Sequence, residues 1–144
     1  MNWTKLVIMA VVSFVVMYAL MYVMTDSYGN VYSSLNQFYM AAMMTGAMVL
    51  IEMVVMGSMY EKKVKVVASG LGVVSLVLFF LFIRGQVGVS DREFLKSMIT
   101  HHGSALLMCE NAKLKDVEVQ DLCKSIISVQ QEQIYCMKMK LKTL

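Results

Sequence analysis

The sequence contains no proline and is poor in charge. Its 144 residues include eight glycines, and only 16% are charged, whereas 58% are hydrophobic. An ordinary soluble chain has about 25% charged residues. The composition therefore disfavours both a soluble globular domain and a disordered chain. The absence of proline and the small number of glycines also exclude collagen-like and low-complexity chains.

Basic residues are too few to suggest nucleic acid as a partner. The net charge is only +3 at pH 7, and no basic stripe runs along any segment. What the chain has in excess is methionine, with 16 residues. Methionine combines a flexible apolar side chain with a soft sulfur atom, so its abundance needs either a packing explanation or a chemical one.

Three hydrophobic runs are long enough to form membrane-spanning helices, which need about 20 apolar residues. They cover about residues 6–24, 38–59 and 66–83, and the second contains one charge, Glu52. The first run is too long for a signal-peptide core, and no A-x-A site follows it. We therefore predict an uncleaved three-span anchor over residues 1–84, with membrane lipid as its surroundings.

The loops between these runs predict an orientation. Lys5 precedes the first run, three lysines lie between residues 60 and 65, and residues 25–37 contain neither Lys nor Arg. Because short cytoplasmic loops are enriched in Lys and Arg, the N-terminus and the second loop are expected in the cytoplasm. The first loop and everything after Arg84 then lie outside, although Arg84 itself goes against the rule. In a bacterium, the chain would be an inner-membrane protein with a periplasmic C-terminal domain.

A helix is predicted soon after the last span. Residues 85–89 are a short linker, and Ser90 with Glu93 forms a capping box, in which each side chain bonds the other residue's backbone N–H. The helix runs to about Leu114, where the lysines on either side suit its negative C-terminal end.

A second helix follows directly, capped by Asp116 and running to about Leu141. The short connection makes the two helices antiparallel neighbours. Residues 90–144 then form an extracytoplasmic hairpin, which is too small to bury a good core alone. We predict an all-α protein whose hairpin pairs with a second copy of the chain. The pair would complete a ferritin-like four-helix bundle in a homo-oligomer, most simply a dimer.

Soft donor atoms gather on the facing sides of these two helices. At about 100° per residue, Met98, His102, Ala105 and Cys109 share a face of the first helix, and His101 lies at its edge. The predicted metal ligands are imidazole, thioether and thiol groups: His101, His102, Met98, Met108, Met137, Cys109 and Cys123, with Met139 nearby.

The chemistry of this donor set favours copper. Thioethers and thiolates select Cu(I), imidazole binds copper in both oxidation states, and soft Ag(I) should follow Cu(I). Mg²⁺ and Ca²⁺ prefer oxygen ligands, and a di-iron bundle needs a glutamate where this chain has Met98, three residues before His101. The alternative is that the methionines only fill the core and that the paired histidines form a polar edge.

The three cysteines are an odd number for a chain with an extracytoplasmic domain. Cys109 and Cys123 can approach each other across the hairpin, where they would form a disulfide, serve as ligands or pack as small hydrophobic side chains. Cys136 points away from the facing side of its helix and is expected to be exposed.

The second span carries a methionine pattern of its own. A ladder of thioethers could pass Cu(I) through the membrane, and the Met-x3-Met spacing is similar to that of high-affinity copper transporters. The residues of this path recur at every fourth position: Met40, Met44, Met48, Glu52 and Met56. On a straight helix, however, each four-residue step turns the side-chain direction by about 40°, so Met40 and Met56 point about 160° apart. The predicted membrane orientation of this chain is also opposite to that of the copper transporters. Packing or lipid contact is the favoured explanation.

Two further features of the spans predict helix contacts. Glu52 falls near the centre of the predicted second span, where an ionised carboxylate is costly. It is expected either to be protonated and hydrogen-bonded to a neighbouring helix or to serve as a proton or cation site. On the third span, Ala68-x3-Gly72, together with Ser69 and Gly70, is expected to give a close-packing face for another helix.

The first helix of the hairpin carries a recognisable motif. The segment from Asp91 to Met108 resembles the family called domain of unknown function 305, the CopM-like proteins, through Asp-x2-Phe-x3-Met-Ile-x-His-His-x2-Ala-x2-Met. The second helix is similar as well, with Ile126-Ile127-x2-Gln130 and Ile134-x2-Met137.

This resemblance implies a ferritin-type four-helix bundle that binds copper, and in some members silver, outside the cytoplasm in metal tolerance. It also implies the metal ligands, which are Met98, His101, His102, Met108 and Met137. Family members usually have glutamate where this chain has Gln133, and they often have two hairpins where this chain has one. The first departure argues against a carboxylate ligand, and the second favours self-association.

Together these observations predict a membrane-anchored extracytoplasmic protein that binds Cu(I) or Ag(I), with Cu(II) as a further candidate, for sequestration or handover. No organic cofactor and no catalytic turnover are expected, and a protein that donates or accepts the metal is an expected partner. The alternatives are a copper transporter or channel that uses the second span and a structural membrane oligomer without metal.

Overall fold

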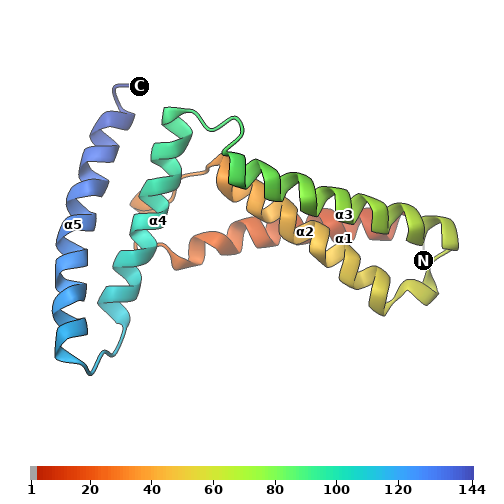
Figure 1. Cartoon of the computed structure of the whole chain (residues 1–144), viewed down its shortest axis with the longest axis horizontal. Helices are drawn as coiled ribbons and strands as arrows, with labels where there is room; N and C mark the ends of the chain where they lie inside the picture. The colour runs from red at the N-terminus through yellow and green to blue at the C-terminus, as the bar shows by residue number, and fades with distance from the viewer. Residues whose placement is uncertain (1–2) are drawn as a thin grey trace. The chain divides into compact units, whose positions relative to one another are not determined.

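The computed structural model describes residues 3–144, and this part of the chain is helical without any strand (Figure 1). The predicted all-α class is therefore confirmed. Five α-helices follow one another along the chain: α1 (Trp3–Leu20), α2 (Leu35–Val55), α3 (Lys62–Gly85), α4 (Asp91–Asn111) and α5 (Val117–Leu141).

The chain divides into two compact units. The span unit contains the residues up to Met21 together with Asn36–Gly88, and the hairpin unit contains Tyr22–Leu35 together with Val89–Leu144. The second unit therefore includes the loop between α1 and α2, which the sequence-based division had grouped with the spans.

Each of the three predicted hydrophobic runs forms one helix long and apolar enough to cross a membrane. The helical segments contain 22, 21 and 24 residues, and the first ends in a short 3-10 turn at Met21–Met24. The second helix ends at Val55, four residues earlier than predicted, because the chain turns at Gly57–Met59. The predicted end was too late because the apolar run continues through this turn.

This earlier end changes the position of Glu52. The carboxylate lies in the last turn of α2 rather than near the middle of a span, and the phenol Oη of Tyr60 donates a hydrogen bond to its Oε1 at 3.0 Å. The predicted position was therefore wrong, and the hydrogen-bond partner is a buried residue of the following turn rather than a neighbouring helix.

Close packing of α2 on α3 holds the span unit together. Ala68 is 2% exposed, and Gly72 is buried so tightly that an added Cβ would lie 2.9 Å from Leu50 and 3.1 Å from the carbonyl oxygen of Gly46. The predicted close-packing face on the third span is thus confirmed for Ala68 and Gly72. Gly70 does not belong to it, since no atom lies within 4 Å of its Cβ position.

The beginning of α4 follows the capping-box prediction only in part. Ser90 Oγ accepts from the backbone N–H of Glu93 at 3.4 Å, as predicted. The Glu93 carboxylate does not bond back to the cap. It accepts instead from the backbone N–H of Leu35 at 3.0 Å and from the ammonium of Lys96 at 2.7 Å.

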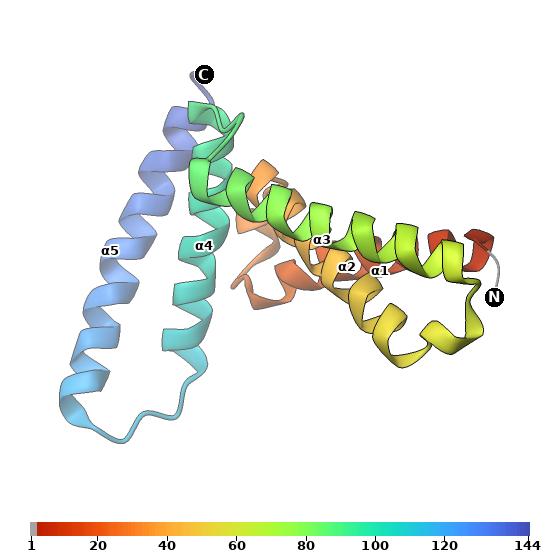
Figure 2. The same ribbon diagram turned by 45° about the vertical axis from the view of Figure 1, so that its right-hand side comes forward.

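The two hairpin helices lie side by side and antiparallel, as predicted (Figure 2). The first ends at Asn111, three residues before the predicted Leu114, so the neighbouring lysines lie in the connection and not in its last turn. Asp116 Oδ1 accepts from the backbone N–H of Val119 at 3.1 Å, and α5 ends at Leu141, both as predicted.

The loop Tyr22–Leu35 packs on α4, and its Tyr32 also packs against the core cluster that α4 shares with α5. Thr100 Oγ1 donates to the carbonyl oxygen of Asn30 at 3.1 Å and accepts from the backbone N–H of Tyr32 at 3.2 Å. An added Cβ on Gly103 would lie only 2.5 Å from Oδ1 of Asp26. If α1, α2 and α3 cross a membrane, the first loop and the hairpin lie on the same side of it in either orientation, because two crossings separate them.

Candidate metal centre

His102 lies in the contact between α4 and α5. It is 8% exposed, and its neighbourhood is the hydrophobic core formed by Ile99, Leu106 and Ile134. Residues three and four positions apart share a helix face, so His102 falls beside the residues of α4 that pack against α5. Its imidazole Nε2 lies 2.8 Å from the amide oxygen Oε1 of Gln133 on α5.

The other ring nitrogen of His102 has no partner. Nδ1 is buried, and no hydrogen-bonding group of the described residues reaches it. Nearly all buried polar atoms in proteins are hydrogen-bonded, so this nitrogen is an exception within the hairpin core. Gln130, one turn before Gln133 on α5, also has a buried amide oxygen without a partner.

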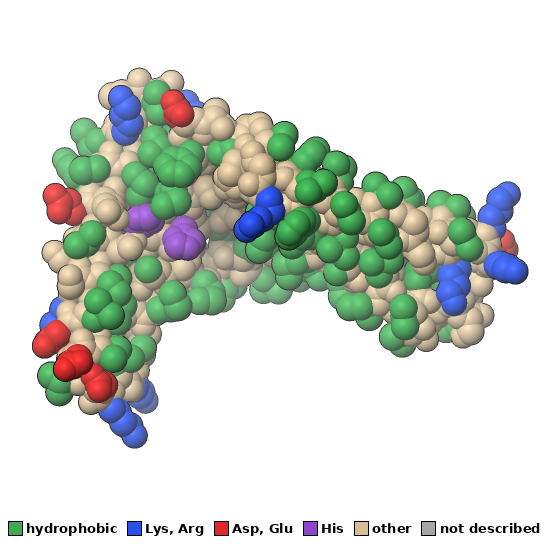
Figure 3. Space-filling view, viewed as in Figure 1, with side chains coloured by type: hydrophobic (Ala, Val, Ile, Leu, Met, Phe, Trp, Pro, Cys, Tyr) green, Lys and Arg blue, Asp and Glu red, His purple; other side chains and the backbone are tan. Residues whose placement is uncertain are grey.

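His101 has different surroundings. Its side chain is exposed, and its ring centroid lies 6.1 Å from that of His102 with the two rings steeply inclined. This agrees with the prediction that His101 lies at the edge of the facing side. In Figure 3 both histidine side chains are visible on one face of the hairpin, with hydrophobic side chains around them.

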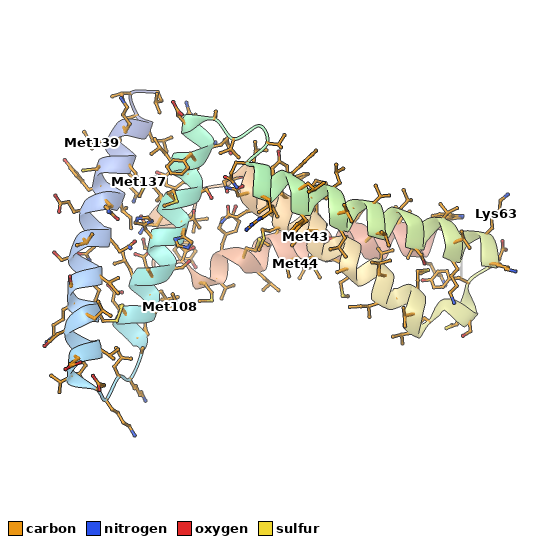
Figure 4. All side chains as sticks on the ribbon, in the orientation of Figure 1. Met43, Met44, Lys63, Met108, Met137 and Met139 are labelled. Carbon is orange, nitrogen blue, oxygen red and sulfur yellow. A yellow bond between two sulfur atoms is a disulfide. The ribbon has the colours of Figure 1, made fainter. Side chains whose placement is uncertain are left out.

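The predicted methionine ligands do not all come together in one hairpin. Met98 is half-buried one turn before His102, and Met137 packs against the core cluster of the hairpin. Met108 is 53% exposed and lies ten residues beyond Met98, or about 15 Å along the helix. Figure 4 shows Met108 towards the α4–α5 connection, whereas Met137 and Met139 lie towards the C-terminal end of α5.

The cysteines adopt one of the three predicted arrangements. Cys109 and Cys123 form a disulfide across the hairpin, with their Cα atoms 5.3 Å apart. In this oxidised form neither residue offers a thiolate to a metal. Cys136 is a free and exposed cysteine, as predicted.

Within residues 3–144, no group of three or more His, Cys, Asp or Glu side chains is placed to hold a metal ion. A metal site in this part of the chain would therefore depend on thioether sulfur, single imidazoles and amide oxygens. The polar contact of His102 is with Gln133 on α5. The other candidate donors of this region are Met98, one turn earlier on α4, Met137, which packs against the hairpin core, and the buried amide oxygen of Gln130.

The methionines of α2 do not line an enclosed path through the span unit. Met40, Met44 and Met48 are exposed on its surface, and Met56 packs against the core. A groove between α1, α2 and α3 is lined by apolar and small residues from Trp3 to Ser75, and none of them is methionine. Met43 and Met44 are labelled on α2 in Figure 4.

Sequence reasoning missed two parts of this site. The first is the loop Tyr22–Leu35, which packs on α4 and carries no apolar repeat that would reveal the contact. The second is the role of Gln133 as the partner of His102. Its spacing of four residues from Met137 on the same helix is the signal that could have indicated it.

Comparisons with known proteins place this hairpin in a known sequence family. The family model described as "Domain of unknown function (DUF305)" matches residues 83–141. The uncharacterized protein L153 of Acanthamoeba polyphaga mimivirus is 30% identical over 138 residues, which cover 93% of this chain and 89% of the viral protein. No solved structure matches the chain.

Proposed function

We propose that this chain, which belongs to the family of the viral protein L153 and carries a DUF305 domain at residues 83–141, is a membrane-anchored metal-binding protein. Its hairpin binds Cu(I) or Ag(I) on the extracytoplasmic side of the membrane. The bound ion is sequestered there or handed to another protein, and no bond in a substrate is made or broken.

The observation that carries this proposal is the unpartnered Nδ1 of His102. A buried imidazole nitrogen without a hydrogen bond is costly, and binding a metal ion would satisfy it. The thioether of Met98 lies one turn away on the same helix, and Met137 lies on the facing helix. Thioether sulfur with imidazole nitrogen is a donor set that prefers Cu(I) to hard divalent ions.

The disulfide supports the proposed location of the hairpin on the extracytoplasmic side of the membrane. Disulfides persist in oxidising compartments and are rare where thiols are kept reduced, and Cys109 is bonded to Cys123 in the hairpin. The loop Tyr22–Leu35, which packs on the same hairpin, contains no Lys or Arg. In a bacterium this side would be the periplasm.

We also propose that two hairpins associate face to face. Phe94, His101 and Met108 recur every seven residues on α4, so they share one exposed face, and Leu122 and Val129 form an exposed face on α5. These residues carry no charge. A second copy would cover them, complete a four-helix bundle and add its own His101 and Met108 to the metal-binding region.

The test is a Cu(I) titration of the full chain in detergent against a coloured competing chelator. The variant with His101→Ala and His102→Ala should bind fewer Cu(I) ions per chain than the unmodified protein, because both imidazole donors are lost. The matched control is Met44→Leu, which removes an exposed thioether of the span unit and should leave the stoichiometry unchanged. An unaltered titration in the double variant would contradict the proposed site.

Transport through a single chain is not part of this proposal. The exposed methionines of α2 and the methionine-free groove of the span unit give no enclosed ladder of sulfur atoms. Metal flux into vesicles that is abolished by Met44→Leu with Met48→Leu would favour a transporter instead.

A further inference from the structure

The side chains of His102 and Gln133 form a polar contact between α4 and α5, with Nε2 and Oε1 2.8 Å apart. The two residues differ in accessibility, because the imidazole is buried in the hairpin core whereas Gln133 is exposed. Most of the residues around the His102 ring are apolar and form no hydrogen bonds with it. The contact with Gln133 therefore fixes the orientation of this imidazole, the only buried one among the described residues.

Two proton arrangements are chemically compatible with such a contact. In the first, Nε2 carries the proton of His102 and donates to the amide oxygen. In the second, Gln133 is turned so that its NH₂ group donates to a bare Nε2, and the proton of His102 is then on Nδ1.

The burial of Nδ1 distinguishes these arrangements. In the second, Nδ1–H would be a buried donor without a partner, and orphaned buried donors are rarer in proteins than incompletely satisfied acceptors. In the first, Nδ1 carries only a lone pair. The first arrangement is therefore favoured, and it agrees with Oε1 facing the ring.

We infer that Gln133 is a positioning residue that holds the His102 proton on Nε2, so that the lone pair of Nδ1 is the atom that binds the metal ion. This inference rests on the proposed function. Gln130 supports it, since its buried oxygen on the same face of α5 is a second acceptor without a donor. Two buried acceptors without donors are expected where a positive ion binds.

Gln133 acts on the ion through His102 and not by contact. Groups that bond the second nitrogen of a metal-binding histidine fix its tautomer and orientation, and their loss typically lowers metal affinity about 10–100-fold. A neutral amide does this without adding negative charge, which suits a monovalent ion held by neutral sulfur and nitrogen donors.

The first part of the test reads the tautomer in metal-free protein. The full chain is labelled with ¹⁵N-histidine, and its spectrum contains only two imidazoles, which His101→Ala assigns. At about pH 8, above the usual imidazole pKa, long-range ¹H–¹⁵N correlations should show His102 protonated only at Nε2. His101, which is exposed, serves as the internal reference for a free tautomer mixture.

Three substitutions then test the role of Gln133. Gln133→Leu removes the acceptor without adding a donor atom for a metal ion, and the Nε2–H form of His102 should lose population relative to the unmodified chain. Gln133→Glu retains an acceptor and should preserve the Nε2–H form. Gln131→Leu, at an exposed neighbouring position of α5, is the matched control and should change nothing.

Titration with Ag(I) alone completes the experiment. In the unmodified chain the ¹⁵N resonance of Nδ1 should shift on binding while Nε2 stays protonated, and Gln133→Leu should weaken Ag(I) binding at least about tenfold. An Nδ1–H tautomer, coordination at Nε2, or unchanged tautomer and affinity in Gln133→Leu would each overturn the inference. If neither nitrogen of the unmodified chain responds to Ag(I), the proposed function fails instead, and the metal-free spectrum still decides the tautomer.

Discussion

Adjacent histidines in a helix point about 100° apart, so they cannot share one environment. His102 is directed into the contact with α5, and His101 is directed to the exposed face of α4. A mononuclear site inside one hairpin can therefore use only His102 directly. His101 becomes a ligand of the same region only if a second hairpin covers the exposed face.

Glu93 shows how one residue joins two segments of the hairpin unit. Its carboxylate accepts hydrogen bonds from Lys96 and from the backbone N–H of Leu35, the first residue of α2. The hydrogen bond from Lys96 is the main cause that lowers the pKa of Glu93 below 4.5, and the bond from Leu35 adds to it, although partial burial opposes both.

This lowered pKa predicts a pH dependence of stability. A carboxyl whose folded pKa lies below its unfolded value stabilises the fold at pH values above the unfolded pKa, and this contribution is lost as the pH falls through the folded pKa. We expect the thermal midpoint of the full chain to fall below about pH 4.5, and to fall less steeply in Glu93→Gln. The control is Glu132→Gln, at an exposed position of α5. Equal pH profiles for the unmodified chain and Glu93→Gln would refute this role.

At the scale of helices, α4 is covered on two sides. Ile99 and Leu106 pack in the core towards α5, while Thr100 and Gly103 contact the loop Tyr22–Leu35. Gly103 follows the two histidines directly, and it has no side chain because the loop approaches too closely for a Cβ. The small residue in the His-His-Gly sequence is therefore explained by packing and not by metal chemistry.

The disulfide between Cys109 and Cys123 is expected to stabilise the hairpin. It closes a loop across a sequence separation of 14 residues, and chain-entropy models assign to such a loop a stabilisation of about 3 kcal/mol. Replacing Cys109 and Cys123 by serine should therefore speed hydrogen exchange of backbone amides in α4 and α5, with Cys136→Ser as the control. The same variant should retain Cu(I) binding, because the proposed metal site is built around His102 and uses neither cysteine. Loss of binding would show that these two cysteines are ligands after all.

The sequence predicts the helices better than it predicts their partners. Runs of apolar residues and the caps Ser90 and Asp116 are local signals, and they located five helices with errors of a few residues at the ends. The predicted hydrogen-bond partner of the Glu93 carboxylate, the backbone N–H of Ser90, was wrong. The carboxylate accepts from Leu35, which lies 58 residues away, and no local pattern reveals a contact of that range. For the same reason the polar contact between His102 and Gln133 was not predicted.

At the scale of the whole molecule, the hairpin unit is assembled from two separate stretches of sequence. The chain leaves α1, contributes Tyr22–Leu35 to this unit, returns to form α2 and α3, and comes back at Val89. Both stretches must lie on one side of a membrane if the three apolar helices cross it, since an even number of crossings separates them.

Cys136 offers a direct test of which side of the membrane the hairpin lies on. As an exposed free thiol on α5, it should react with a membrane-impermeant maleimide added outside intact cells or spheroplasts that express the chain. In a Cys136→Ser background, Lys63→Cys between α2 and α3 should react only after permeabilisation. The reverse pattern would invert the proposed orientation, and labelling of both positions in intact cells would argue against membrane insertion.

The loop that packs on α4 has a consequence for how the hairpin can be handled. A fragment starting at residue 90 would retain both long helices and the disulfide, yet it would leave Thr100 without Asn30 and Tyr32 and would expose Gly103, which Asp26 and Thr25 of the loop approach closely. The C-terminal residues alone therefore lack part of their own unit. The missing segment lies more than fifty residues upstream, between α1 and α2, so the hairpin unit is complete only in the full chain.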